Sequence, residues 1–244
     1  MKKEEYALMH RLEDKHWWFS GKRYLIFRFI DKFYRDKDNI ILDVGCGTGI
    51  IMREFGKYGK VYGVDTSDEA LKFCRDRGLK KVRKSSVLKL PFKDNSFDIV
   101  GCFDVLYHKG VSNDVEALKE IYRVLKIGGR VFITDSAMMC LWGRHDLATH
   151  ARERYSKKEL KEKLERVGFK IEKISYYNFF LFPIVLLTRK IDNIVNRKKS
   201  AKSNIEETNK FFNSLLFSLF KLETNLLNLT NFPFGVSIFC IARK

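Results

Sequence analysis

The chain has 244 residues, of which 45% are hydrophobic and 32% are charged, and its formal net charge is +17. This length and composition predict one globular domain with an elaboration, and they exclude two full domains or a largely disordered chain. The positive charge favours contact with anions such as nucleic acid, anionic lipid or a phosphorylated substrate, although scattered lysines that only keep a protein soluble explain it equally well.

Helices and strands alternate through the first half of the chain. Two helices are predicted before residue 35, because Tyr24, Phe27, Ile30 and Phe33 recur at helical spacing. Strands are predicted at 40–44, 60–65, 80–85, 97–104 and 130–135, and helices from Gly49, at 67–78 and at 113–129. The alternation predicts an α/β fold with a Rossmann-like, doubly wound, mostly parallel sheet, whose ligand lies at the carboxyl ends of the strands.

The alternation ends after residue 135. A loop-like stretch leads to a helix at 156–169, a strand at 170–177, an apolar and aromatic insertion at 178–231, and a last strand at 234–244. The second half of the insertion repeats apolar residues at helical spacing, so we expect a helical insertion before the last strand.

A glycine-rich turn follows the first strand in "IILDVGCGTGI". The spacing is G-x-G-x-G at Gly45, Gly47 and Gly49, with Asp43 two residues before the first glycine. Glycine lets the backbone approach a ligand and adopt positive φ, so a strand, a glycine turn and a helix form a nucleotide cradle. Asp65 ends the next strand, where a carboxylate meets the hydroxyls of an adenosine ribose. The alternative is a tight turn that only connects the strand to the helix, and it does not account for the two acids Asp43 and Asp65.

Four segments in order resemble the class I S-adenosylmethionine-dependent methyltransferases, in the group called methyltransferase type 11: "ILDVGCGTG", "VYGVD", "LPFKDNSFDIV" and "LKEIYRVLKIGGRVFITD". The resemblance implies S-adenosylmethionine as the cofactor and places the methyl donor beside Cys102 to Asp104. The residues that it assigns to the cofactor are Asp43, Gly45, Cys46, Gly47, Gly49, Asp65, Thr66, Ser86, Val87 and Phe103. Ser86 stands where the family often has Asp, so we expect weaker contacts with the adenine but not lost binding.

The resemblance implies a seven-stranded sheet with an antiparallel last strand in one domain, 1–244. That domain is expected to comprise an N-terminal helical lid (1–36), a cofactor-binding core (37–137) and a substrate-side region (138–244) that contains the insertion.

Both ends of the chain resemble a subgroup of these enzymes, many members of which accompany cell-surface glycan or lipid-linked pathways. The matching features are an N-terminal "HWWF" box, a "HD…H.R.RY" stretch and a "PFG.S" close. Trp18 and its aromatic neighbours are expected to cover the cofactor pocket and contact the substrate, or alternatively to pack the first helices onto the sheet.

Three histidines are candidates for a general base acting on a hydroxyl acceptor, because imidazole titrates near neutrality. They are His108, His145 and His150, and the alternative is that they are ordinary loop residues. Arg152 and Arg154 are candidates to clamp an anionic substrate group, with Tyr155 beside them. The alternative for these arginines is a solvated start of the helix that follows.

The insertion combines phenylalanine and leucine with basic residues. The basic residues are Arg189, Lys190, Arg197, Lys198, Lys199 and Lys202. Such a segment can lie on a membrane surface or line a tunnel for a lipid-like substrate. The alternative is a helical cap that is buried on the domain.

Cysteine usage and the N-terminus suggest a location. No C-x-x-C pair occurs among the five cysteines, so we expect buried thiols in a reducing compartment, with no disulfide framework and no metal site. The N-terminus lacks a signal-peptide core, and no apolar stretch approaches the roughly 20 residues that span a bilayer. We therefore expect a cytoplasmic protein, with peripheral contact at the inner membrane face as an option.

These observations predict a methyltransferase that acts on a small-molecule or lipid-linked acceptor, at an oxygen atom. One alternative is an RNA methyltransferase, which the net charge favours; the sequence shows no Asn/Asp-Pro-Pro-aromatic box and no RNA-binding module. Nucleic acid is therefore disfavoured as a partner but stays open. The other alternative is a membrane-associated protein that binds S-adenosylmethionine without catalysis. The oligomeric state is not indicated.

Overall fold

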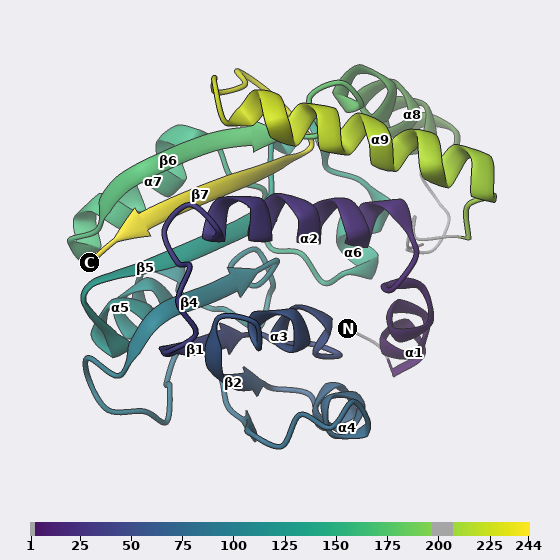
Figure 1. The fold of residues 1–244 in the computed structure, drawn as a ribbon. Coiled ribbons are helices and arrows are strands. Elements are labelled where there is room, and N and C mark those ends of the chain that lie inside the picture. Colours follow the sequence, from purple (N-terminus) through teal and green to yellow (C-terminus); the bar gives the residue numbers. More distant parts are fainter. Residues whose placement is uncertain (1–2, 197–206) are drawn as a thin grey trace.

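The computed structural model describes residues 3–196 and 207–244, and within them seven strands form one twisted sheet (Figure 1). The strands are β1 (Asn39–Val44), β2 (Gly59–Asp65), β3 (Val82–Lys84), β4 (Phe97–Phe103), β5 (Leu125–Ser136), β6 (Lys170–Tyr177) and β7 (Ser237–Arg243). Their order is β3-β2-β1-β4-β5-β7-β6. Neighbours among β1 to β5 pair in parallel, whereas β7 is antiparallel to both β5 and β6. The predicted Rossmann-like sheet is confirmed.

Helices cover both faces of this sheet. They are α1 (Lys3–Leu12), α2 (Trp17–Ile30), α3 (Ile50–Phe55), α4 (Asp68–Asp76), α5 (Asp114–Val124), the 3-10 turn η1 (Met139–Leu141), α6 (Arg144–Ala148), α7 (Lys157–Val167), α8 (Phe182–Val195) and α9 (Lys210–Leu227). Successive residues of a strand point to opposite faces, so Ile41 packs with α2 and α9 while Leu42 packs with α5 and α7. Strands buried on both faces explain the apolar runs of the sequence.

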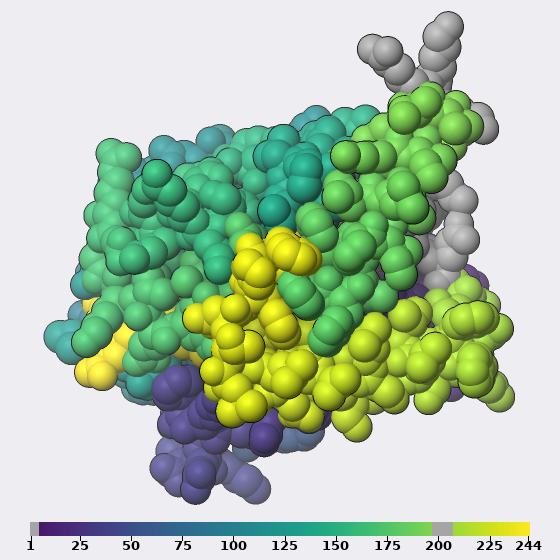
Figure 2. All heavy atoms as spheres, turned by 90° about the horizontal axis from the view of Figure 1, so that it is seen from above, coloured from purple at the N-terminus to yellow at the C-terminus, as the bar shows by residue number. Residues whose placement is uncertain are grey.

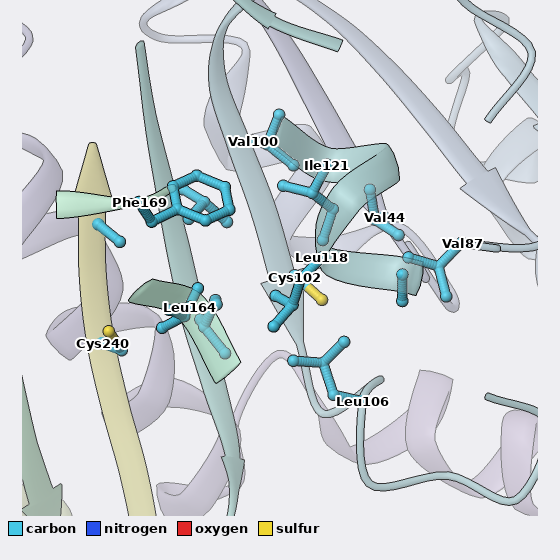
Figure 3. Close-up of a cluster of buried hydrophobic side chains, with 14 of the residues drawn as sticks. Val44, Val87, Val100, Cys102, Leu106, Leu118, Ile121, Leu164, Phe169 and Cys240 are labelled. Atoms are coloured by element: carbon cyan, nitrogen blue, oxygen red, sulfur yellow. The ribbon is translucent and has the colours of Figure 1, made fainter. Parts of the chain in front are cut away.

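The cluster on the α5 and α7 face contains two of the chain's thiols. Figure 3 shows Cys102 of β4 and Cys240 of β7 among aliphatic side chains of α5 and α7. Four of the five cysteines are buried, Cys140 is exposed, and all five are free thiols. Burial raises the pKa of the Cys102 thiol, so this cysteine contributes packing and not a reactive thiolate.

The insertion before the last strand forms two helices, α8 and α9, on the same side of the molecule (Figure 1). α9 packs against α2, where Phe220 lies over the backbone of Gly21. Both ends of the chain therefore meet on one face of the sheet. Four of the basic residues predicted for the insertion, Arg197, Lys198, Lys199 and Lys202, lie outside the described residues. No helix in the described ranges is long and apolar enough to cross a membrane.

One predicted boundary is wrong. The helix predicted at 113–129 ends at Val124, and Leu125 already has extended backbone and pairs with Phe97 of β4. Gly128 follows with φ of 81°, a conformation that a helix interior does not contain. The glycines that suggested a helix C-terminus instead belong to the first half of β5.

The variant Gly21→Val tests the contact between α2 and α9. A Cβ at this position would lie 2.4 Å from Cδ2 of Phe220. The ring must therefore move, and overpacking of this kind costs about 1–3 kcal/mol of unfolding free energy, measured by chemical denaturation. Combination with Phe220→Ala should cost less than the sum of the two single changes, because the valine then fills part of the vacated space. Simple additivity would contradict a direct contact.

Candidate functional site

A cavity of about 690 Å³ follows the carboxyl edge of the sheet. Its floor is the glycine loop after β1 and the ends of β2, β4 and β5. Its walls come from α1, α2, α6 and α8, which belong to segments far apart in the sequence. Parallel strands present their carboxyl ends at one edge, and this edge is where ligands of open α/β sheets bind.

The glycine loop closes one end of the cavity. Gly45, Gly47 and Gly49 have φ of 69°, 52° and 85°, which side chains with a Cβ rarely adopt. A Cβ on Gly45 would also lie 2.4 Å from Val105 Cγ2. The turn is therefore bare because its conformation and its neighbours leave no room for side chains. Gly45 and Gly47 line the cavity, whereas Gly49 forms the N-cap of α3 behind it.

Two carboxylates flank this loop. Asp65 accepts hydrogen bonds from the backbone N–H groups of Gly47 (3.0 Å) and Ser67 (2.9 Å), which fix its orientation. Asp43 is 2% exposed, and burial together with the nearby Asp65 raises its pKa to about 8. No hydrogen bond or ion pair within the described ranges offsets the desolvation of Asp43. An uncompensated acid facing a cavity fits a cationic ligand.

Helix α1 covers the same end. Tyr6 and Met9 of this helix line the cavity, and so does Glu13, the residue that follows the helix. The buried Glu13 carboxylate accepts a hydrogen bond from Thr48 Oγ1 (2.5 Å) and pairs with Arg77, so the helix is tied both to the glycine loop and to the end of α4. The sequence analysis missed these three residues, because nothing in their local pattern shows which surface the helix covers.

The end of β4 lies midway along the cavity. Phe103 and Asp104 line it there, and the Asp104 carboxylate forms an ion pair with the buried Lys22 of α2. Asp104 has φ of 56°, an unusual conformation for a residue other than glycine. Trp18 lies beside this pair, with Lys22 Nζ 5.8 Å from the centre of its ring. Trp18 lines the cavity. Its contact with the substrate stays a prediction.

Of the three candidate histidines, His108 and His145 line the cavity and His150 does not. Burial lowers the pKa of His108 to about 4, and its Nδ1 accepts a hydrogen bond from Gly110 N–H at 3.0 Å. Burial and the charge of Arg189 lower the pKa of His145 to about 4 as well. Both imidazoles are therefore neutral at physiological pH. His150 has φ of 56°, and its ring lies 6.0 Å from that of His108.

The structure places Arg152, Arg154 and Tyr155 outside the cavity lining. Arg154 is buried, and its guanidinium donates to Asp146 (2.7 Å) and to the Ala137 carbonyl (2.8 Å). The Tyr155 hydroxyl and Arg152 both donate to Asp114, at 2.8 and 3.1 Å. These side chains therefore hold the loop after β5 against its neighbours.

The cavity brings together most of the residues that the sequence assigned to the cofactor. Those lining it are Asp43, Gly45, Cys46, Gly47, Asp65, Thr66, Ser86, Val87 and Phe103. The other wall holds Arg189 of α8, which the sequence analysis noted only as one of several basic residues in the insertion. No local signal distinguishes Arg189 from its neighbour Lys190.

Comparison with known proteins agrees with this geometry. Residues 42–133 match the family model described as a methyltransferase domain. An uncharacterised methyltransferase of Schizosaccharomyces pombe is 38% identical over 141 residues, which are 50% of this chain and 50% of that protein. A ubiquinone/menaquinone biosynthesis C-methyltransferase of Ectopseudomonas mendocina is 38% identical over 108 residues, covering 40% of this chain and 41% of that one. The chain thus spans about half the length, or less, of these relatives.

Solved structures share the fold over more of the chain. An S-adenosylmethionine-dependent methyltransferase of Thermotoga maritima superposes with a TM-score of 0.59 at 19% identity, covering 99% of this chain and 95% of that one. A phosphoethanolamine N-methyltransferase of Haemonchus contortus, solved with S-adenosylhomocysteine, gives a TM-score of 0.60 at 20% identity, covering 91% of this chain and 52% of that one.

The cavity also fits the cofactor of such enzymes. The bare glycine loop can approach the ligand closely, Asp65 presents an oriented carboxylate for ribose hydroxyls, and the uncompensated Asp43 suits a sulfonium or ammonium cation. Residues 42–133 therefore match a methyltransferase domain, within a chain that has the class I methyltransferase fold and a cavity that suits S-adenosylmethionine.

Proposed function

We propose that this chain transfers the methyl group of S-adenosylmethionine to a hydroxyl oxygen of a small-molecule or lipid-linked acceptor. The observation that supports this most is the continuity of the cavity. One space joins the glycine loop, the end of β4 and the inner face of α8. A cofactor at the glycine loop leaves the far part, toward α6 and α8, for the acceptor. The resemblance to the "HWWF" subgroup belongs to this proposal.

The residues at the cofactor end bind and orient. Asp65 would accept hydrogen bonds from the ribose hydroxyls, Asp43 would face the positive charge of the methionine part, and Ser86 and Val87 would flank the adenine. When bound, S-adenosylmethionine supplies an electrophilic methyl group. A direct displacement on that carbon depends on alignment and on exclusion of water, to which Phe103 and Trp18, two aromatic residues of the lining, would contribute.

A hydroxyl acceptor must lose its proton, and His145 is our candidate to receive it. It is neutral at physiological pH and lines the acceptor half of the cavity. His108 is less suited, because its Nδ1 already accepts the hydrogen bond of Gly110 and its other nitrogen then carries the proton. Asp146 and Asp104 favour the protonated form of His145, but burial and the charge of Arg189 outweigh them and keep the imidazole neutral.

The outer face of the insertion supports a lipid-linked acceptor. Ile184, Leu187, Ile191 and Ile194 are exposed at alternating spacings of three and four residues along α8, so they form one stripe. The opposite side of the same helix carries Val185 and Arg189 into the cavity. Figure 2 shows α8 (green) and α9 (yellow-green) side by side on the face seen from above.

α9 adds exposed apolar side chains to this face, among them Phe211 and Leu215. The exposed Lys190 and Lys221 belong to the same two helices. We therefore propose peripheral contact with an anionic membrane, in the cytoplasm at the inner membrane face. An acceptor held in that membrane would reach the cavity alongside α8.

Methyl-labelled S-adenosylmethionine, incubated with the protein and an extract of its source cells, tests the acceptor class. We expect label in the organic fraction or among small water-soluble molecules. Label in RNA would overturn the proposal. No label in any fraction, with normal cofactor binding, would support a protein that binds the cofactor without catalysis.

Cofactor binding should release a proton that comes from Asp43. The pKa of Asp43 is about 8 in the protein alone, so this carboxyl is mostly protonated at pH 7. A bound cation favours the carboxylate and lowers that pKa, so close to one proton should leave. Calorimetry at pH 7 in buffers of different ionisation enthalpy measures the number. Asp43→Asn should abolish the release, and an unchanged release in this variant would contradict the assignment.

Replacing His145 should slow methyl transfer without weakening cofactor binding. We expect His145→Gln to reduce kcat about 100-fold or more, the usual contribution of a general base. His150→Asn is the matched control, because its side chain lies outside the cavity lining and asparagine tolerates the positive φ. The acceptor fraction found by labelling serves as substrate, and calorimetry with S-adenosylhomocysteine checks the cofactor site.

The same assay has a pH signature. With a pKa of about 4, His145 stays unprotonated as the pH falls from 8 to 6, so its titration should not lower the rate over that range. A histidine with an ordinary pKa of about 6.5 would lose most of its free base by pH 6. In the comparison of the two variants, an equal loss of kcat in His145→Gln and His150→Asn would contradict the assignment of His145 as the base.

Vesicle flotation tests the membrane contact. The protein should bind vesicles that contain about 30% phosphatidylglycerol and bind neutral phosphatidylcholine vesicles weakly. Leu187→Glu should weaken binding about tenfold, because burial of one leucine contributes about 1.5–3 kcal/mol. The control is Ile127→Glu in β5, where the isoleucine is 87% exposed but lies outside the insertion. Equal effects of the two changes would argue against docking through α8.

A further inference from the structure

We propose that Arg189 forms the recognition site for an anionic group, a phosphate or a carboxylate, on the methyl acceptor. This inference rests on the proposed function and narrows its substrate class to anionic amphiphiles. It concerns the end of the cavity formed by α6 and α8, away from the glycine loop. Four observations carry it: the placement of the guanidinium, its donor without a partner, the local charge balance and the apolar stripe on the opposite side of the same helix.

The Arg189 side chain is held rigidly in the cavity wall. It is 11% exposed, and its Nη1 donates to the Leu141 carbonyl (2.6 Å) and to Asp146 Oδ2 (2.7 Å). Its Nε is buried and has no hydrogen-bond partner within the described ranges. A buried donor without a partner costs about 1–3 kcal/mol, so the protein does not fully satisfy this guanidinium although the side chain lines the cavity.

The charges around Arg189 do not balance. Asp146 is a single buried carboxylate, yet it pairs with both Arg154 and Arg189, at 2.7 Å each. The adjacent Arg144 is matched by Asp192 at 3.1 Å. Among the described residues, Arg154 and Arg189 thus share the single carboxylate of Asp146. Burial and the proximity of Arg154 lower the pKa of Arg189, which is the expected effect of excess positive charge.

No other acid of the lining compensates this charge. The carboxylates that line the cavity within the described ranges are Glu13, Asp43, Asp65 and Asp104. The first three lie at the glycine loop, and Asp104 is paired with Lys22. An anion brought by the acceptor would therefore be the group that neutralises Arg189. The planar guanidinium suits the oxygens of phosphate or carboxylate.

The position on α8 indicates what else the acceptor carries. Arg189 projects from the side of the helix opposite to the exposed stripe of Ile184, Leu187 and Ile191. An amphiphile could keep its apolar part along that outer stripe and place its anionic group inside at Arg189. The acceptor hydroxyl would then lie between the anionic group and the donor at the end of β4.

Calorimetry on the full chain loaded with S-adenosylhomocysteine tests this site. The probes are hexyl phosphate, heptanoate, hexanol and hexyltrimethylammonium, which share a six-carbon chain and differ in the charge of the head group. We expect the two anions to bind at least tenfold more tightly than hexanol and the cation not to bind. Whichever anion binds more tightly identifies the group. Equal binding of hexanol and both anions, or preference for the cation, would overturn the proposal without any variant.

Two variants locate the binding. Arg189→Gln should weaken the preferred anion at least tenfold, whereas Lys190→Gln removes the same charge from the exposed neighbour and should change binding less than twofold. Equal losses would mean a general charge effect and would overturn the assignment. If Arg189→Gln does not fold, Arg189→Lys replaces it in the test. This variant keeps the positive charge but loses the planar guanidinium, so it should also bind the anion more weakly.

The affinity for S-adenosylhomocysteine distinguishes a failure of the proposed function from a failure of the anion site alone. If the wild-type protein binds neither S-adenosylhomocysteine nor the anions, the proposed function itself fails. If it binds S-adenosylhomocysteine but no anion, only the anion site fails. If Arg189→Gln weakens S-adenosylhomocysteine and hexyl phosphate competes with it, Arg189 binds the cofactor carboxylate, and the proposed acceptor site is wrong.

Discussion

The acceptor side of the cavity depends on one buried carboxylate, Asp146. It accepts the first N–H of α6 from Gly143 (2.9 Å), and it pairs with Arg154 and Arg189. Arg154 in turn donates to the Ala137 carbonyl after β5, so one acid joins the sheet edge, α6 and the insertion. Loss of the carboxylate would leave two buried guanidiniums without their counter-charge, a defect that typically costs about 3–5 kcal/mol. These contacts hold the loop after β5 against the sheet edge and the insertion.

The cofactor half could be predicted from the sequence because its determinants are local. The strand, the glycine spacing and Asp43 occupy eleven consecutive residues, and Asp65 ends the very next strand. In a parallel sheet the carboxyl ends of adjacent strands meet at one edge, so neighbours in sequence become neighbours in space. Backbone conformation adds to this, since positive φ at Gly45 and Gly47 requires glycine whatever the tertiary context. The mostly parallel, doubly wound character of the sheet follows from the same alternation of strands and helices.

The acceptor half could not be predicted in this way, because its determinants are long-range pairings. Arg154 and Arg189 look alike in sequence, and an arginine in a polar loop invites a substrate role. In the structure both arginines pair with Asp146, Arg154 across eight residues and Arg189 across forty-three. Only Arg189 also lines the cavity. The pairing of Lys22 with Asp104 spans eighty-two residues. A pattern of residue types carries no information on such partners until the helices are placed on the sheet.

The cavity that results has opposite charge at its two ends. Asp65 makes the glycine loop acidic, and Asp43 adds a second negative charge once a bound cation displaces its proton; the pair of Lys22 and Asp104 is neutral midway, and Arg189 is the positive group at α8. A cationic methyl donor and an anionic acceptor are each attracted to one end and disfavoured at the other. If the proposed donor and acceptor are correct, these charges would orient both molecules toward the end of β4 before any specific contact forms. Because the cavity is lined by buried groups, salt screens this orientation less than it screens the basic outer surface.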